Sequence, residues 1–177
     1  MRTRISILAV AAALLGVTAC GDSKPSAPSA PVPAETSLSQ AQTPPAPAVP
    51  FDAKTMLEKL TDADVGLAKG TVQDEDTDPN NLLGRPNGYT SRASADLPGG
   101  AKDGDKYSIE RGLVIEVFAT KDDADRRSTF IQDSLRSMPI LGTEYHYRAD
   151  GGRVLVRVTG KVKPSASKKI EQVVASL

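Results

Sequence analysis

Hydrophobic positions recur with two different periods in the second half of the chain, and these periods predict its strands and helices. Every second residue from Leu113 to Val117 is aliphatic, which is the pattern of a strand with one buried face. After Thr120, a suitable helix cap, apolar residues recur at helical spacing as far as Pro139, which cannot continue a helix. We therefore predict a strand followed directly by a helix.

A β-hairpin and a last helix are predicted next. Residues 144–149 alternate tyrosine or alanine with polar side chains, and residues 154–158 place valine at every second position. The residues between them, Asp150-Gly151-Gly152, supply a turn that puts the tyrosines on the valine face. After Pro164, apolar residues at helical spacing predict an amphipathic helix.

The first half of the folded region carries weaker patterns. Asp52 is a suitable N-cap for a short amphipathic helix, and short strands are predicted near residues 71–73 and 89–95. The order is then helix, strand, strand, helix, strand, strand, helix. We predict an α+β fold with a small, mainly antiparallel sheet and helices packed on one face.

Composition narrows the classes of function. The 177 residues include 22 Lys or Arg and 22 Asp or Glu, a formal net charge of zero, so no basic surface for nucleic acid is expected. Aromatic residues make up 4% and Trp is absent, which argues against a stacking platform for sugars or bases. A single His and a single Cys argue against a transition-metal site. We expect no cofactor and no metal.

The first 50 residues have a different composition from the rest. Arg2 and Arg4 precede an uncharged apolar run over residues 5–16, which is too short to be a comfortable membrane span. Small residues then lead to Cys20. Residues 21–50 are mainly Pro, Ala, Ser, Thr and Gln, a composition that predicts a disordered linker, with a reach of up to roughly 90 Å at ~3.1 Å per residue.

The segment Val17-Thr18-Ala19-Cys20 resembles the lipobox of bacterial lipoproteins. The resemblance implies that the Cys20 thiol receives a diacylglyceryl group, that residues 1–19 are removed as a signal peptide, and that acyl chains such as palmitate hold the protein on the extracytoplasmic side of the cell membrane. The alternative is an ordinary secretory signal, which would leave an unpaired thiol on an exported protein. We expect a lipidated Cys20 with its linker over 20–50 and one α+β domain over 51–177.

A second resemblance covers the folded region. The string D-P-N-N-L-L-G-R-P-N-G-Y-T-S at residues 78–91 is accompanied by I-E-V-F at 115–118, E-Y-H-Y at 144–147 and V-L-V-R-V at 154–158. Together they resemble a family of small exported bacterial lipoproteins. The resemblance implies a common fold, and it implies no particular activity and no catalytic residue.

Candidate binding residues gather in the loop of the first motif. Asn80, Arg85, Asn87 and Tyr89 combine a planar guanidinium, amides and a phenol, side chains that suit directional recognition of a partner. The alternative is structural: Asn and Gly shape turns, and Arg85 pairs with the acidic run before it. The sequence leaves both interpretations open.

His146 is the first candidate for acid–base chemistry because it is the only imidazole. The alternative is a surface histidine in a charged cross-strand ladder. Asp74, Asp76, Asp78 and Asn80 alternate like the start of a calcium loop, but Pro79 and Arg85 stand where that loop needs Gly and Glu. A solvated acidic loop is the favoured interpretation there.

Two classes of function follow. The first is a lipid-anchored extracytoplasmic module, attached through Cys20, that binds an envelope protein, a peptide or a cell-wall component without catalysis. The second is a small hydrolase-like enzyme that uses His146 as a general acid or base. The sequence contains no recognisable nucleophile motif or metal-ligand cluster, which favours the first class.

Overall fold

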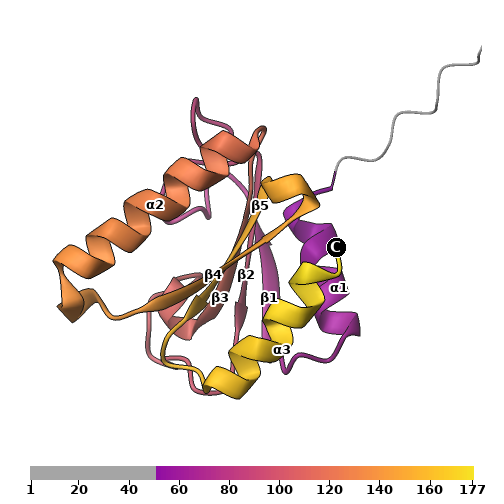
Figure 1. The fold of residues 1–177 in the computed structure, drawn as a ribbon, viewed down its shortest axis with the longest axis vertical. Coiled ribbons are helices and arrows are strands. Elements are labelled where there is room, and N and C mark those ends of the chain that lie inside the picture. The colour runs from indigo at the N-terminus through magenta and orange to yellow at the C-terminus, as the bar shows by residue number, and fades with distance from the viewer. Residues whose placement is uncertain (1–50) are drawn as a thin grey trace, which may run out of the picture. The chain divides into compact units, whose positions relative to one another are not determined.

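The computed structural model describes residues 51–177, so the predicted signal peptide, Cys20 and linker lie outside the described residues. The described chain forms three α-helices and a five-stranded sheet (Figure 1). Three short 3-10 segments connect them. In chain order the elements are α1 (Ala53–Asp62), β1 (Lys69–Gln73), β2 (Ser91–Asp96), η1 (Ile109–Arg111), β3 (Gly112–Val117), α2 (Lys121–Ser137), η2 (Pro139–Leu141), β4 (Glu144–Ala149), η3 (Asp150–Gly152), β5 (Val154–Thr159) and α3 (Pro164–Ala175).

The sheet has the strand order β1-β2-β3-β5-β4, and every neighbouring pair is antiparallel. The last strand, β5, lies between β3 and its own hairpin partner β4, so β1 and β4 form the two edges. The predicted α+β class, the antiparallel sheet and the order of helices and strands are confirmed.

One face of the sheet packs against α1 and α3 and holds the main core. Tyr145 pairs with Val158 and Tyr147 with Val156, so the predicted placement of the tyrosines on the valine face is confirmed. The Tyr147 hydroxyl lies 2.7 Å from the Ser167 hydroxyl of α3. The largest buried side chains of this core are Met56, Leu60, Val65, Leu97, Leu113, Ile115, Val117, Val154, Val156, Val158, Val162, Ile170 and Val174.

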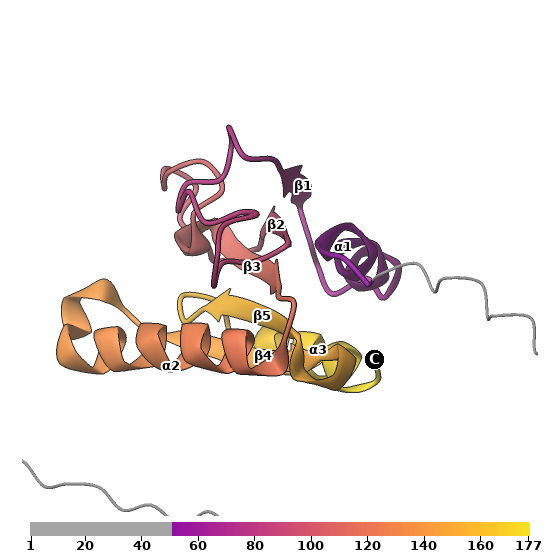
Figure 2. The same cartoon turned by 90° about the horizontal axis from the view of Figure 1, so that it is seen from above.

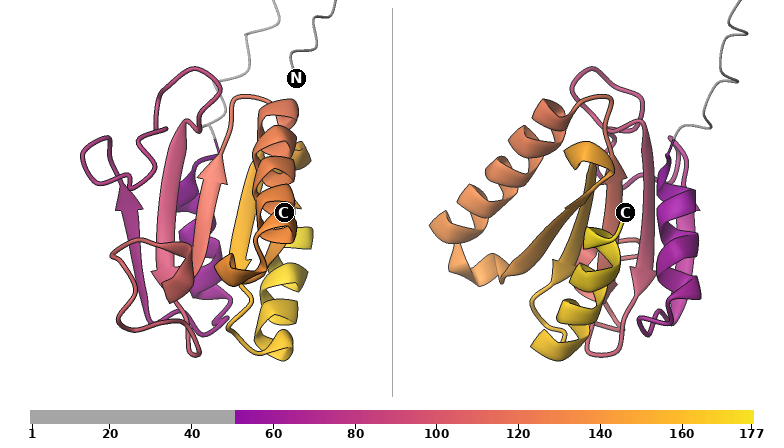
Figure 3. Two further views of the ribbon diagram at one scale, coloured as in Figure 1. Left: turned by 90° about the vertical axis from the view of Figure 1, so that its left-hand side faces the viewer. Right: turned by 45° about the vertical axis from the view of Figure 1, so that its right-hand side comes forward.

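The prediction that helices pack on one face holds for α1 and α3, whereas α2 lies against the opposite face. Figures 2 and 3 show α2 across the sheet from α1, over the end formed by β5 and β4. Only Ala124 and Ile131 of α2 are buried. Its other contacts with the sheet are polar, because the strand positions that face it carry charged side chains and an imidazole.

Helices α1 and α2 begin at the capping residues that the sequence predicts, and α2 also ends where predicted. The Asp52 carboxylate accepts a hydrogen bond from the Thr55 N–H at 2.7 Å, and the Thr120 hydroxyl accepts one from the Asp123 N–H at 3.1 Å. These contacts confirm both predicted caps. The helix α2 ends at Ser137, just before Pro139, as predicted. Within residues 51–177, no helix has both the length and the apolar character needed to cross a membrane.

Candidate functional site

The sheet face opposite α1 and α3 is built largely from polar side chains in register. Antiparallel pairing sets Arg92 beside Glu116, and His146 beside Arg157. Helix α2 covers the β5–β4 end of this face, and a small second core around Tyr89 and its neighbours covers another part. We refer to this surface below as the polar face.

A buried ionic network occupies the centre of the polar face. Glu116 is fully buried, and its carboxylate accepts a hydrogen bond from Arg157 Nη1 at 3.1 Å. Nε and Nη2 of Arg157 each donate to Glu144 at 2.8 Å. Arg127 of α2 brings a second guanidinium to Glu116 at 3.3 Å. Each buried carboxylate therefore has a guanidinium partner, which offsets the desolvation of these charges.

His146 connects this network to α2. Its Nε2 lies 3.0 Å from a Glu144 oxygen, and its Nδ1 lies 2.6 Å from the Ser128 hydroxyl. An ionised carboxylate can only accept, so Nε2 carries a proton and donates it to Glu144. The predicted charged ladder is present. The sequence pattern predicts this ladder histidine at the surface, but α2 covers the imidazole and only 9% of the side chain is exposed.

Ser128, His146 and Glu144 have the order of a nucleophile, a base and a carboxylate, yet the surroundings do not suit acyl transfer. Ser128 lies inside α2, where backbone N–H groups are bonded within the helix and cannot stabilise an oxyanion. Glu144 is already bound by Arg157. Burial alone would raise the pKa of Glu144, but its bonds to His146 and Arg157 outweigh burial and lower it to about 2.

The loop of the first motif is held from within by Asp78. One carboxylate oxygen accepts from the Tyr89 hydroxyl at 2.5 Å, and the other accepts from the N–H groups of Leu82 and Leu83 at 2.7 and 3.0 Å. Tyr89 is 1% exposed and meets the Phe118 ring edge-on at 6.0 Å between centroids. These contacts fasten the loop to the sheet.

The predicted binding residues of this loop divide into an inner and an outer group. Tyr89 is interior, and the amide of Asn80, an exposed residue, donates to its hydroxyl at 3.3 Å. Arg85 and Asn87 are exposed. Arg85 donates to the Asn81 side chain at 2.7 Å, so the expected pairing with the acidic run is replaced by a contact within the loop. A binding role for these residues and for His146 stays a prediction.

Turn chemistry explains much of the same loop. Asn81 and Asn87 adopt positive φ angles of 52° and 63°. A Cβ at Gly88 would lie 2.0 Å from the Leu82 carbonyl oxygen, so that position requires glycine. Among residues 51–177, no three His, Cys, Asp or Glu side chains converge as a metal site would need.

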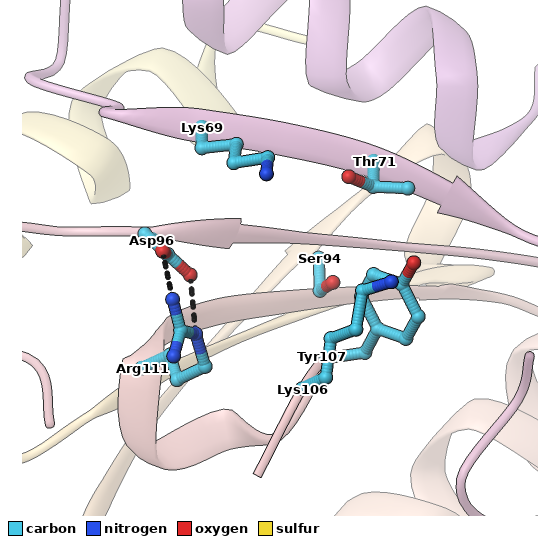
Figure 4. A pocket seen from close by; sticks show the side chains of 7 residues that line it. All are labelled: Lys69, Thr71, Ser94, Asp96, Lys106, Tyr107 and Arg111. Atoms are coloured by element: carbon cyan, nitrogen blue, oxygen red, sulfur yellow. Dashed lines mark hydrogen bonds and ion pairs between the residues drawn. The ribbon is translucent and has the colours of Figure 1, made fainter. Parts of the chain in front are cut away.

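An open hollow lies at the other end of the polar face, beside the edge strand β1. Figure 4 shows its side chains: Lys69, Thr71, Ser94, Asp96, Lys106, Tyr107 and Arg111. We call it the β1–β2 hollow. Asp96 and Arg111 form a two-bond ion pair at 2.9 and 2.5 Å. Arg111 also donates to the carbonyls of Lys102 and Gly104, which fixes the segment that covers this part of the sheet.

Large apolar side chains are exposed at the C-terminal end of α2. Ile140 is 93% exposed, Leu141 55% and Met138 50%. We call these three residues the apolar tip. Phe130, two turns earlier on the same helix, is 65% exposed. Met138 directly follows Ser137, the last residue of α2, and its side chain faces outward there.

Sequence reasoning missed the hollow, the buried pair of Arg92 and Glu116, and the nearness of Ser128 to His146. A signal for the hollow was present: Lys69, Thr71 and Gln73 alternate along the chain, as Arg92, Ser94 and Asp96 do, although the predicted strands, 71–73 and 89–95, left out Lys69 and Asp96. Polar alternation on two adjacent strands indicates one polar face. Ser128 gave no such signal, because it meets His146 only when α2 folds across the sheet.

Comparison of the chain with protein-family models, with curated proteins and with solved structures gives no match. The polar face, the β1–β2 hollow and the apolar tip therefore have to be interpreted from their own geometry.

Proposed function

We propose that the chain is a lipid-anchored extracytoplasmic module that binds a protein partner in or near the cell envelope without catalysis. Its resemblance to a lipobox at Val17 to Cys20 supports the anchor. One acyl chain gives marginal membrane binding and two give stable binding, so a diacylated Cys20 would hold the protein at the membrane. The predicted linker would let the folded domain reach partners at a distance from the lipid surface.

The observation that carries the binding role is the apolar tip. An isoleucine that is 93% exposed, with two further half-exposed apolar neighbours, leaves apolar surface in water that a partner could cover. Buried apolar surface contributes about 25 cal/mol per Å² to association. The tip follows the last residue of α2, and Figure 1 shows that end of the helix away from the centre of the sheet, where a partner can approach it.

The charges beside the tip favour a protein over an anionic bilayer. Asp133 pairs with Arg136 beside the tip, and Asp123 pairs with Arg126 at the other end of the helix, so these basic side chains of α2 are matched by acidic ones. Helices that lie on membranes carry an excess of Lys and Arg on the polar face. Paired charges of both signs around an apolar centre are typical of the rim of a protein interface.

Site-specific photocrosslinking in intact cells tests this proposal. A photoreactive residue at Ile140 should give a discrete protein adduct, and one at Val72, an exposed apolar position on β1, should not. Ile140→Ser combined with Leu141→Ser should remove the adduct formed from Met138. Both side chains are exposed, so this double variant should keep its melting temperature. Labelling of lipid alone, or the same adducts from Val72, would contradict the proposal.

A hydrolase-like activity is the second candidate, favoured by the 2.6 Å contact of Ser128 with His146. It requires α2 to move, because the helix covers the imidazole. Hydrolysis of an activated acetyl ester that disappears in both Ser128→Ala and His146→Ala would favour it. Hydrolysis unchanged in either variant would exclude it.

A further inference from the structure

The β1–β2 hollow presents hydrogen-bond donors from three separate segments. Lys69 and Thr71 come from β1, Ser94 from β2, and Lys106 from the chain between β2 and β3. Thr71 and Ser94 are direct cross-strand partners, so their hydroxyls lie side by side on the polar face. Figure 4 shows both ammonium groups bordering the same space as these hydroxyls.

The charge of the hollow is positive. Asp96 is its one acidic side chain, and the two-bond contact with Arg111 neutralises it. Within the described residues, neither Lys69 nor Lys106 has a carboxylate partner within 4.0 Å. Lys69 is the cross-strand partner of Asp96, but that carboxylate is already bound by Arg111. The hollow therefore carries an excess of positive charge, and an anion would gain from both ammonium groups.

A buried relay orients the Ser94 hydroxyl as a donor. Arg92 can only donate, and its Nη1 bonds to Gln73 Oε1 at 2.8 Å, which fixes the orientation of the Gln73 amide. Gln73 Nε2 then donates to Ser94 Oγ at 3.1 Å. The Ser94 oxygen is used as an acceptor, so its own hydrogen is left for a group in the hollow. Ser94 is 6% exposed, which places this donor at the floor.

The segment that covers the hollow is held in a strained conformation. Tyr107 has a φ of 66°, a value that bulky side chains rarely adopt. Arg92 Nη2 donates to the Tyr107 carbonyl at 2.9 Å and stabilises this backbone. The Tyr107 ring meets the Lys106 ammonium at 4.7 Å. The buried Arg92 guanidinium thus positions Ser94 at the floor of the hollow, through Gln73, and Tyr107 in the segment that covers it.

We propose that the β1–β2 hollow binds a compact oxyanion, the carboxylate or phosphate group of a ligand. Two ammonium groups and two hydroxyls surround a space next to a neutralised acidic side chain, an arrangement that recognises negative oxygen atoms through charge-assisted hydrogen bonds. A cation has no free carboxylate to bind there, since Arg111 occupies Asp96. The site is separate from the apolar tip and does not depend on the partner proposed for it.

Titration with three probes tests this site. The full chain carrying Cys20→Ser, so that no lipid is attached, is titrated with inorganic phosphate and with acetate, and binding is followed by NMR shifts of the Ser94 and Tyr107 amides. Phosphatidylglycerol vesicles form a third arm, because a lipid headgroup carries the same phosphate chemistry. We expect saturable binding of at least one probe, weakened about tenfold by Lys69→Ala and by Lys106→Ala.

Lys59→Ala is the matched control, since Lys59 is an exposed lysine on α1, across the sheet from the hollow. It should bind each probe as the unsubstituted chain does, and all three variants should keep their melting temperature. Vesicle binding alone, lost in both hollow variants, would identify the oxyanion as a lipid headgroup. Equal binding by the hollow variants and Lys59→Ala, or no saturation with any probe, would overturn the proposal.

Discussion

At the scale of single residues, the polar face shows how far charge can be buried when each group has a partner. Glu116 is fully buried and Arg92 is 2% exposed, positions that hydrophobic patterning assigns to apolar side chains. Glu116 is held by the guanidinium groups of Arg127 and Arg157, whereas Arg92 donates to the Gln73 amide and the Tyr107 carbonyl. Removing one partner of a buried ion pair costs about 3–5 kcal/mol in the free energy of unfolding. The contribution of Glu144 to the free energy of unfolding can be measured by varying the pH.

Glu144 should make the fold sensitive to acid. Its pKa is about 2 in the folded chain against 4.5 for the free side chain, so it stabilises the fold fully above about pH 5. Its contribution, about 3 kcal/mol, should disappear as the pH falls toward 2. Urea unfolding between pH 6 and pH 2 measures this, and Glu144→Gln should flatten the decline.

Asp133→Asn is the control for this measurement, because Asp133 is exposed on α2 and contacts only Arg136. This variant should keep the acid profile of the unsubstituted chain. A Glu144→Gln profile as steep as that of the unsubstituted chain would show that other carboxylates govern the acid response.

At the scale of elements, local patterns predicted the helices and strands but not the layer to which α2 belongs. Caps at Asp52 and Thr120 and the alternation of the hairpin are properties of neighbouring residues, and the structure confirms them. The polar face depends on pairs far apart in sequence, such as Glu116 with Arg157. No local period reports such a pair, so the ionic network could not be predicted, whereas the polar alternation along β1 and β2 was a local signal for the hollow.

In the loop over residues 78–91, a substitution of an interior side chain should destabilise the fold, whereas a substitution of a surface side chain should not. Tyr89→Phe removes the hydrogen bond to Asp78, and we expect a loss of about 1–3 kcal/mol in the free energy of unfolding. Arg85→Ala should change it by less than about 0.5 kcal/mol, since Arg85 is exposed and contacts only its own loop. Urea titration measures both. The reverse order of effects would show that Arg85 holds the loop.

At the scale of the whole molecule, we predict that residues 51–177 fold without the segment that precedes them. The N-cap of α1 is Asp52, and the side chains of both cores lie within residues 51–177. A chain that starts at Phe51 should therefore melt within about 2 °C of the chain that starts at Gly21. Calorimetry measures the difference. A fall of about ten degrees would show that the preceding residues pack on the domain.

The proposed function depends on where the chain is held, and the state of Cys20 decides that. Membrane fractionation of cells that make the chain, with mass spectrometry of its first residue, measures it directly. We predict that the mature chain sediments with membranes and begins with a diacylglyceryl-modified Cys20, whereas Cys20→Ser leaves the membrane fraction or stays unprocessed. A Cys20→Ser chain that is processed and retained at the membrane as the unsubstituted chain is would contradict the account.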